Sequence, residues 1–120
     1  MNAVAVVSQS GDKFSPKDPA ASEFFYWDFT NNLRPGETIV SAVVTSSSVF
    51  FHADNTTAMV SGSALVLNGA VVRQQIQGGQ YGISYDLKCA ATTSIAGGAG
   101  QVLVLTGILP VGAELGVVSS

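Results

Sequence analysis

The sequence has little charge and almost no cysteine or histidine. Only 11% of its 120 residues are charged, and it holds one cysteine and one histidine. A single cysteine excludes a fold held together by intrachain disulfides, and the lack of paired cysteines, paired histidines or clustered carboxylates excludes the usual metal sites. Five bases against eight acids give a net charge of −3, which provides no basic surface for nucleic acid or an anionic membrane. We therefore expect no metal, no cofactor, no nucleic-acid partner and no membrane partner.

Long apolar runs and an export signal are also missing. The longest apolar stretches, 102–105 and 108–111, are far shorter than the ~20 residues that a membrane-spanning helix needs. Residues 1–7 lack the cationic start and extended apolar stretch of a secretion signal. We therefore expect the chain to be made in a cytoplasm.

Residues that could serve catalysis are few and scattered. His52 and Cys89 could form a base and a nucleophile, but nothing in their spacing supports such a pair. No Gly-x-Ser-x-Gly motif is present, and the glycine-rich stretch 97–100 is followed by neither a lysine nor a helical pattern. Cys89 lies on the apolar face of an alternating segment, which favours a small buried side chain. The sequence predicts no enzyme and no catalytic, cofactor-binding or metal-binding residue.

Residues that favour strands and turns are abundant instead. The chain has 22 serines and threonines, 16 valines and 13 glycines among its 120 residues, a composition suited to β-structure and poor for surface helices. Seven to nine short runs separated by turn signals predict an all-β fold, an antiparallel β-sandwich, with a small barrel as the alternative. We expect one domain over residues 1–120, with extended arms at about 1–22 and 111–120.

The most distinctive predicted strand covers residues 23–30, which hold five of the ten aromatic residues. Alternate residues of a strand face opposite sides, so Phe25, Trp27 and Phe29 are expected to form the centre of the core. Asp28 lies on the other face, where it is expected to fix the following turn through local hydrogen bonds.

The remaining strands are predicted from apolar runs and two-residue alternation. Turns are expected at Pro35-Gly36 and Asn68-Gly69, and a break at 46–48. The stretch 92–100 is expected to be a loop, and the last strand, apolar on both faces, is expected to be central in its sheet. The predicted strands cover 4–7, 39–45, 49–51, 58–67, 70–77, 81–89 and 101–109.

Two stretches of the sequence carry motifs that occur together in a known protein family. The first, over about 17–41, begins with Lys-Asp-Pro, continues through an aromatic strand with an Asp-aromatic-Thr step, and ends with Leu-x-x-Gly-Glu-Thr-Ile. The second, over about 76–105, contains Gly-Gly, a Gly-x-x-Tyr strand and Thr-Thr-Ser. Together they resemble a family of small structural proteins of tailed bacteriophages. The motif residues are Trp27, Asp28, Phe29, Gly36, Glu37, Thr38, Gly82 and Tyr85.

The resemblance implies an Ig-like β-sandwich and a place in the virion, and it brings no catalytic residue with it. It gives the motif residues structural roles: the glycines form turns, Tyr85 is a core or corner tyrosine, and 36–38 start a strand. The leading hypothesis is a capsid decoration, or cement, protein that binds the major capsid protein as a homo-oligomer. The alternative is a neck, head–tail joining or tail accessory protein that binds head–tail connector proteins.

A carbohydrate- or receptor-binding sandwich is a further alternative. Phe24, Tyr26 and Trp27 could stack on sugars if they faced the solvent. Their position in a predicted core strand argues against this role.

Overall fold

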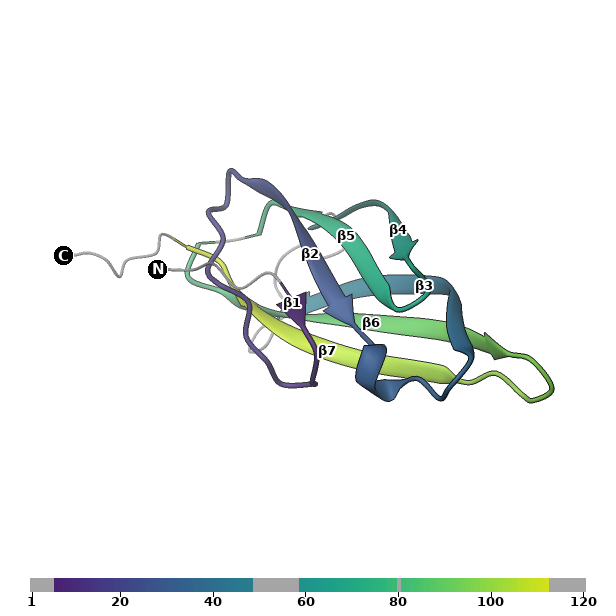
Figure 1. Cartoon of the computed structure of the whole chain (residues 1–120). Helices are drawn as coiled ribbons and strands as arrows, with labels where there is room; N and C mark the ends of the chain where they lie inside the picture. Colours follow the sequence, from purple (N-terminus) through teal and green to yellow (C-terminus); the bar gives the residue numbers. More distant parts are fainter. Residues whose placement is uncertain (1–5, 49–58, 80, 113–120) are drawn as a thin grey trace.

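The computed structural model describes residues 6–48, 59–79 and 81–112, which form seven strands and one short 3-10 helix (Figure 1). The predictions for 49–51 and for His52 lie outside these residues. The elements are β1 (Val6–Val7), β2 (Ser22–Asp28), η1 (Thr30–Asn32), β3 (Glu37–Ser48), β4 (Val60–Leu67), β5 (Val71–Gln77), β6 (Ser84–Ile95) and β7 (Val102–Pro110).

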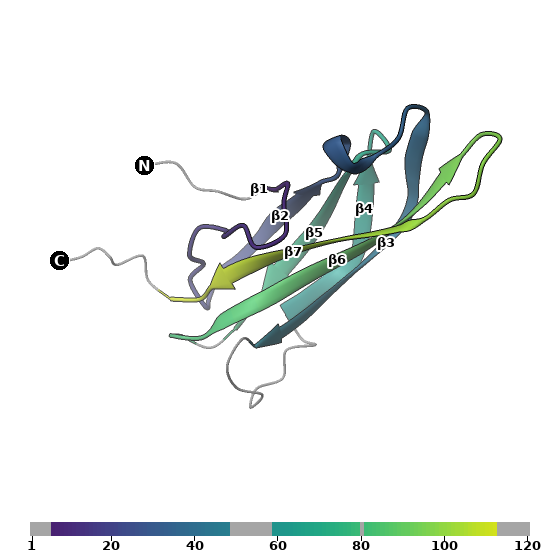
Figure 2. The same cartoon turned by 90° about the horizontal axis from the view of Figure 1, so that it is seen from below.

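The strands form two sheets that pack face to face, as Figures 1 and 2 show. One sheet has the order β1-β2-β5-β4 and the other the order β3-β6-β7. This is the strand order of a constant-type Ig domain, except that β1 runs parallel to β2. The predicted β-sandwich is confirmed, and the barrel alternative is wrong because the sheets do not join into a closed ring.

The core lies between the inner faces of the two sheets. Phe25 and Trp27 on β2, and Phe29 directly after it, are at most 2% exposed, which agrees with the predicted alternation. Trp27 faces β6, where its indole Nε1 donates a hydrogen bond to the Leu87 carbonyl at 3.4 Å. The Phe14 ring adds to this cluster, with its centroid 4.8 Å from that of Phe25 and 5.5 Å from that of Trp27.

Both predicted tight turns form where residues with a positive φ permit them. Gly36 has a φ of 80° and the Glu37 amide donates to the Arg34 carbonyl, which closes a turn with Pro35-Gly36 at its centre. Asn68 and Gly69, with φ angles of 52° and 68°, form the two-residue connection between β4 and β5.

Long strand pairing overrides several local predictions. The break expected at 46–48 is wrong because β3 pairs with β6 as far as Ser48. For the same reason β6 continues to Ile95, into the stretch expected to be a loop. At its other end β6 begins only at Ser84, which leaves Tyr81 outside the strand and 65% exposed.

The last strand occupies a different place from the one expected. The prediction that it is central is wrong, because β7 is an edge strand of its sheet. Its outward-facing valines are exposed, and its free edge is partly covered by the segment 10–17. The amides of Gly11, Phe14 and Lys17 in that segment donate to three carbonyls of β7 at 2.8–3.0 Å. The described part of the expected N-terminal arm therefore lies against the sandwich.

Candidate binding surfaces

The outer face of the β1-β2-β5-β4 sheet carries aromatic, aliphatic and cationic side chains side by side. The guanidinium carbon of Arg73 on β5 lies 4.6 Å from the centre of the Phe24 ring on β2, so the ring holds the cation by a cation–π contact. Strand register places one row of side chains across all four strands. That row holds Val6, Tyr26, Arg73 and Leu65, and Phe24 lies in the adjacent row on β2. We call these five residues the aromatic–arginine face.

Arg73 forms no ion pair with another described residue. Within the described ranges the structure has one ion pair, which joins Arg34 to Glu37 at 2.9 Å. Arg73 therefore pairs with no carboxylate among the described residues. Phe24 and Leu65 beside it are each 46% exposed, so an apolar surface surrounds a fixed cation. Such a combination suits contact with another protein.

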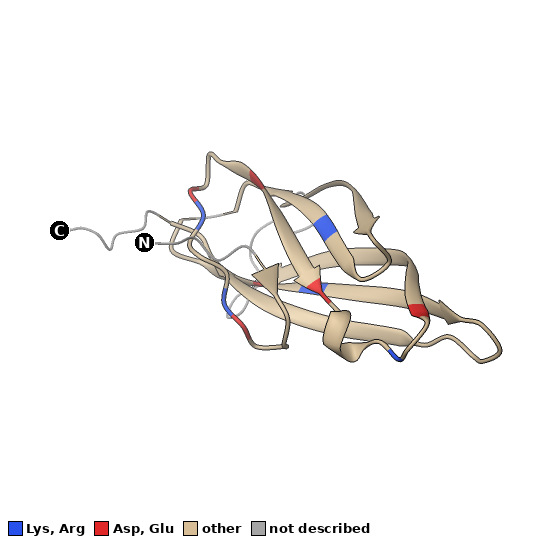
Figure 3. Cartoon of the chain, in the orientation of Figure 1, with Lys and Arg blue, Asp and Glu red and all other residues tan. Residues whose placement is uncertain are grey.

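The outer face of the β3-β6-β7 sheet is apolar in a different way. Its exposed large hydrophobic side chains are all valines, and small or hydroxyl side chains lie between them. We call this the valine face. It is formed by Val40, Val43, Val102 and Val104, which are 59%, 63%, 61% and 47% exposed, together with Ala90 between them. Charged residues are sparse over both sheets (Figure 3).

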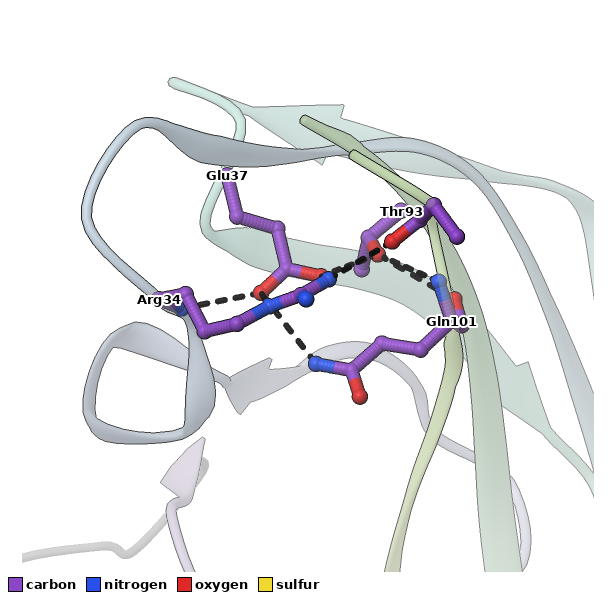
Figure 4. A network of polar contacts seen from close by, with 5 residues as sticks. Arg34, Glu37, Thr93 and Gln101 are labelled. Carbon is purple, nitrogen blue, oxygen red and sulfur yellow. Dashed lines mark hydrogen bonds and ion pairs between the residues drawn. The ribbon is translucent and has the colours of Figure 1, made fainter. Parts of the chain in front are cut away.

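A polar network closes one end of the sandwich (Figure 4). The Glu37 carboxylate accepts hydrogen bonds from the Arg34 side chain at 2.9 and 3.2 Å, from the Arg34 amide at 2.8 Å and from the Gln101 amide group at 3.2 Å. The Thr93 hydroxyl donates to the same carboxylate. Arg34 also donates to the Ala99 carbonyl at 2.9 Å. These bonds attach the β2–β3 connection to the base of the β6–β7 hairpin, so the network positions the hairpin.

The network is expected to make the stability of the fold depend on pH. Hydrogen bonds from Arg34 and Thr93 hold the pKa of Glu37 well below its ordinary value of 4.5. The Glu37 carboxyl therefore accepts a proton more readily in the unfolded state than in the folded state. Its contribution to the free energy of unfolding is complete above pH 4.5 and falls as the pH drops below that value. We expect Glu37→Gln to reduce this dependence, so that the stability gap between wild type and variant narrows as the pH falls.

Urea unfolding at neutral pH and at several values below 4.5 measures this gap, with Trp27 fluorescence as the signal. Wild type and variant compared at neutral pH provide the reference. Equal losses of stability in both proteins on acidification would show that Glu37 is not the group responsible.

Lys17 is a buried cation. In the sequence it stands out only as the first residue of the Lys-Asp-Pro motif, and its burial is not predicted. Its side chain is 0% exposed, and its Nζ donates to the carbonyls of Asp18 and Gly78 at 2.8 and 2.7 Å. Burial lowers the pKa of Lys17, whereas the charges of Glu23 and Asp18 act in the opposite direction. Lys17 joins the N-terminal segment to the β5–β6 connection.

The other predicted motif residues lie apart from one another and do not form one site. The Asp28 carboxylate accepts bonds from the Thr30 amide and hydroxyl at 2.9 and 2.6 Å and so fixes the turn after β2. Gly82 has a φ of 86° and its amide donates to Val111. The other residues occur singly: Trp27, Phe29 and Tyr85 are in the core, Gly36 is in the β2–β3 turn, and Glu37 and Thr38 begin β3.

The described residues do not support stacking of sugars on all three aromatic side chains considered above. Trp27 is 0% exposed, whereas Phe24 is 46% exposed and Tyr26 is partly buried. Phe24 already contacts Arg73. Trp27 is therefore a core residue and cannot face a ligand.

The described residues also offer few groups that could bind a metal or act as a nucleophile. Among them, no three histidines, cysteines or acids lie together as a metal site would require. The thiol of Cys89 is buried, and burial raises its pKa to about 12, so that the thiol stays protonated. No helix in this part of the chain is long and apolar enough to cross a membrane.

Comparison with known proteins gives a family match. Residues 17–106 match the family described as podophage GP4 fiber-tail adaptor protein gp77. The matched range starts at the buried Lys17 and contains β2 to β6 and the first half of β7. No curated protein and no solved structure matches the chain.

Proposed function

The chain belongs to the gp77 family of podophage GP4 fiber-tail adaptor proteins, and from this we propose that it joins a tail fiber to the tail of a podophage particle. Membership makes the protein a structural component of the phage virion. The resemblance to phage structural proteins is therefore correct at that level. The more specific role, attachment of a tail fiber to the tail, is what we propose.

The family agrees better with the tail alternative than with head decoration. A fiber-tail adaptor contacts tail components, so the expected partners are a tail protein and a tail fiber in place of the major capsid protein or the head–tail connector. The proposed role is binding without catalysis. It requires surfaces that can be occupied by other proteins.

Two outer faces of different chemistry support this role. An adaptor must contact more than one protein, and faces on opposite sides of a sandwich can be occupied at the same time. The aromatic–arginine face has the residue types that contribute most to protein interfaces, tyrosine and arginine among them. Arg73 is already positioned by Phe24, so little side-chain entropy is lost when a partner carboxylate binds it. We propose that this face binds another virion protein.

Particles made without this protein test the proposal. We expect such particles to keep their tail and lose their fibers, and purified protein added with purified fiber to restore them. Electron microscopy and the amount of fiber protein on washed particles measure both outcomes. Arg73→Glu should fail to restore the fibers, because a like charge would face the partner carboxylate. Lys13→Glu, at an exposed side chain of the segment 10–17, should succeed.

Two results would contradict the proposal. Fibers that remain on particles lacking the protein would exclude the adaptor role. Copies of the protein could instead be found distributed over the head, in numbers set by the capsid lattice and not by the tail symmetry. That result would favour the capsid decoration hypothesis over the adaptor role.

A further inference from the structure

The valine face is a continuous strip across three strands. Strand register places Val43, Ala90 and Val104 in one row across β3, β6 and β7, and Ser41, Thr92 and Val102 in the adjacent row. All outward side chains of these two rows are uncharged. Since monomeric proteins seldom expose a contiguous apolar patch without a use for it, the strip is a candidate interface.

Charge on this face lies to one side of the strip. Along β6, Lys88 is in the next row from Ala90 and Asp86 in the row after that. In the other direction the outward residues of β6 are Thr92 and Ser94. Among the described residues of this face, therefore, the charged side chains of Lys88 and Asp86 lie beyond one end of the strip. Hydroxyl side chains lie beyond the opposite end.

We propose that the valine face pairs with the valine face of a second copy of this chain. The two-fold axis crosses the strands along the row of Val43, Ala90 and Val104. A two-fold interface places the same patch on both subunits, so it requires a surface that is complementary to itself. The row of Val43, Ala90 and Val104, which lies on the axis, meets that requirement because apolar contact has no direction and no sign.

The axis follows from the positions of the charges. When the axis crosses the strands, β6 lies antiparallel over β6 of the second copy, and residue 90+k of one copy lies opposite residue 90−k of the other. Lys88 then lies opposite Thr92, and Asp86 opposite Ser94. An axis parallel to the strands would instead place Lys88 on Lys88 and Asp86 on Asp86, and like charges in contact oppose association.

The aromatic–arginine face does not suit this kind of pairing. A two-fold axis through its middle would bring two copies of Arg73 together, and among the described residues no carboxylate is paired with either. Pairing through the valine face leaves both aromatic–arginine faces outward, on opposite sides of the dimer. The dimer would thus offer two attachment points to other virion proteins.

The size of the face predicts a weak dimer. Three strands and the nine residues from 86 to 94 span an area of about 14 Å by 27 Å, from ordinary strand spacing and rise. That is below the roughly 800 Å² that each partner buries in an interface of standard size. We therefore expect association at high protein concentration, where neighbouring copies on a particle would also be held.

Cross-linking of single-cysteine additions tests the axis. Val43→Cys, which lies on the axis, should give a cross-linked dimer with a short bis-maleimide, since Val43 faces its own copy. Asp86→Cys and Ser94→Cys should each cross-link poorly alone and well when mixed. The native Cys89 is 0% exposed and should not react. Equal cross-linking of Asp86→Cys alone and in the mixture would overturn the proposed axis.

Sedimentation of the purified chain over a wide concentration range tests the dimer itself. We expect Val43→Asp and Val104→Asp to abolish association, and Leu65→Asp on the opposite face to leave it unchanged. All three side chains are exposed, and circular dichroism checks that each variant is folded. A wild type that stays monomeric, or association lost equally in Leu65→Asp, would overturn the inference. This result is independent of fiber attachment, which is measured on particles.

Discussion

Lys17→Met is expected to lower the free energy of unfolding by about 1–3 kcal/mol, the cost of leaving one enclosed acceptor without its donor. The Nζ of Lys17 is the donor for the carbonyls of Asp18 and Gly78, and its side chain is 0% exposed. Methionine fills a similar volume but donates no hydrogen bond. The Asp18 carbonyl also accepts a hydrogen bond from the Ala21 amide at 2.9 Å, so the loss should come mainly from the Gly78 carbonyl and not from a cavity.

Lys13→Met is the matched control for this change. Lys13 lies four residues earlier in the same segment and is exposed, so the same substitution should change stability by at most about 0.5 kcal/mol. Urea unfolding followed by Trp27 fluorescence measures both variants, since Trp27 is the one tryptophan of the chain and is buried. Equal stabilities for the two variants would show that the Lys17 bonds contribute nothing to folding.

Gly107→Val is expected to separate the N-terminal segment from β7 and to cost about 2–5 kcal/mol, the range for losing a buried aromatic contact or overpacking a core. A Cβ atom at Gly107 would lie 2.6 Å from the Phe14 ring and 2.7 Å from a Val7 methyl group. Both side chains are buried, so neither can move aside without leaving the core. The backbone of β7 itself can accept valine, which favours strands.

Hydrogen exchange distinguishes this local release from general loss of stability. The Phe14 amide, which donates to Ile108 at 2.8 Å, should exchange much faster in Gly107→Val, while amides between β3 and β6 keep more of their protection. Val102→Ala is the control on the same strand, because Val102 is 61% exposed and distant from Phe14 in register. Unchanged protection at Phe14 would show that Gly107 does not set the position of the segment.

The candidate surfaces were only partly predictable from the sequence. Alternation in β2 places Phe24 and Tyr26 on the side opposite the core residues, and this much is local. Nothing in the sequence shows that Arg73, 49 positions after Phe24, lies over its ring, because the register of β2 and β5 brings them together. The valine face was hidden for a similar reason. Apolar residues on both sides of the last strand suggested a central strand, whereas β7 lies at the edge of its sheet.

The sequence by itself determined the elements and much of the core. Two-residue alternation in β2 and β6 identifies the buried side of each strand, and Pro35-Gly36 and Asn68-Gly69 locate two turns. These features are local, because side-chain direction in a strand and positive φ in a turn depend on adjacent residues. The scarcity of charge was also visible at once, and it agrees with outer faces on which charged residues are sparse (Figure 3).

Only the tertiary structure decided which polar residues are buried and which apolar residues stay exposed. Lys17 is enclosed because Gly78, 61 residues later, supplies a carbonyl, and Glu37 is enclosed by Thr93 and Gln101 from the β6–β7 hairpin. Val43 and Val104 are exposed because no third layer covers the β3-β6-β7 sheet within the described ranges. Burial depends on the order and packing of the sheets, and contacts between distant residues fix that order.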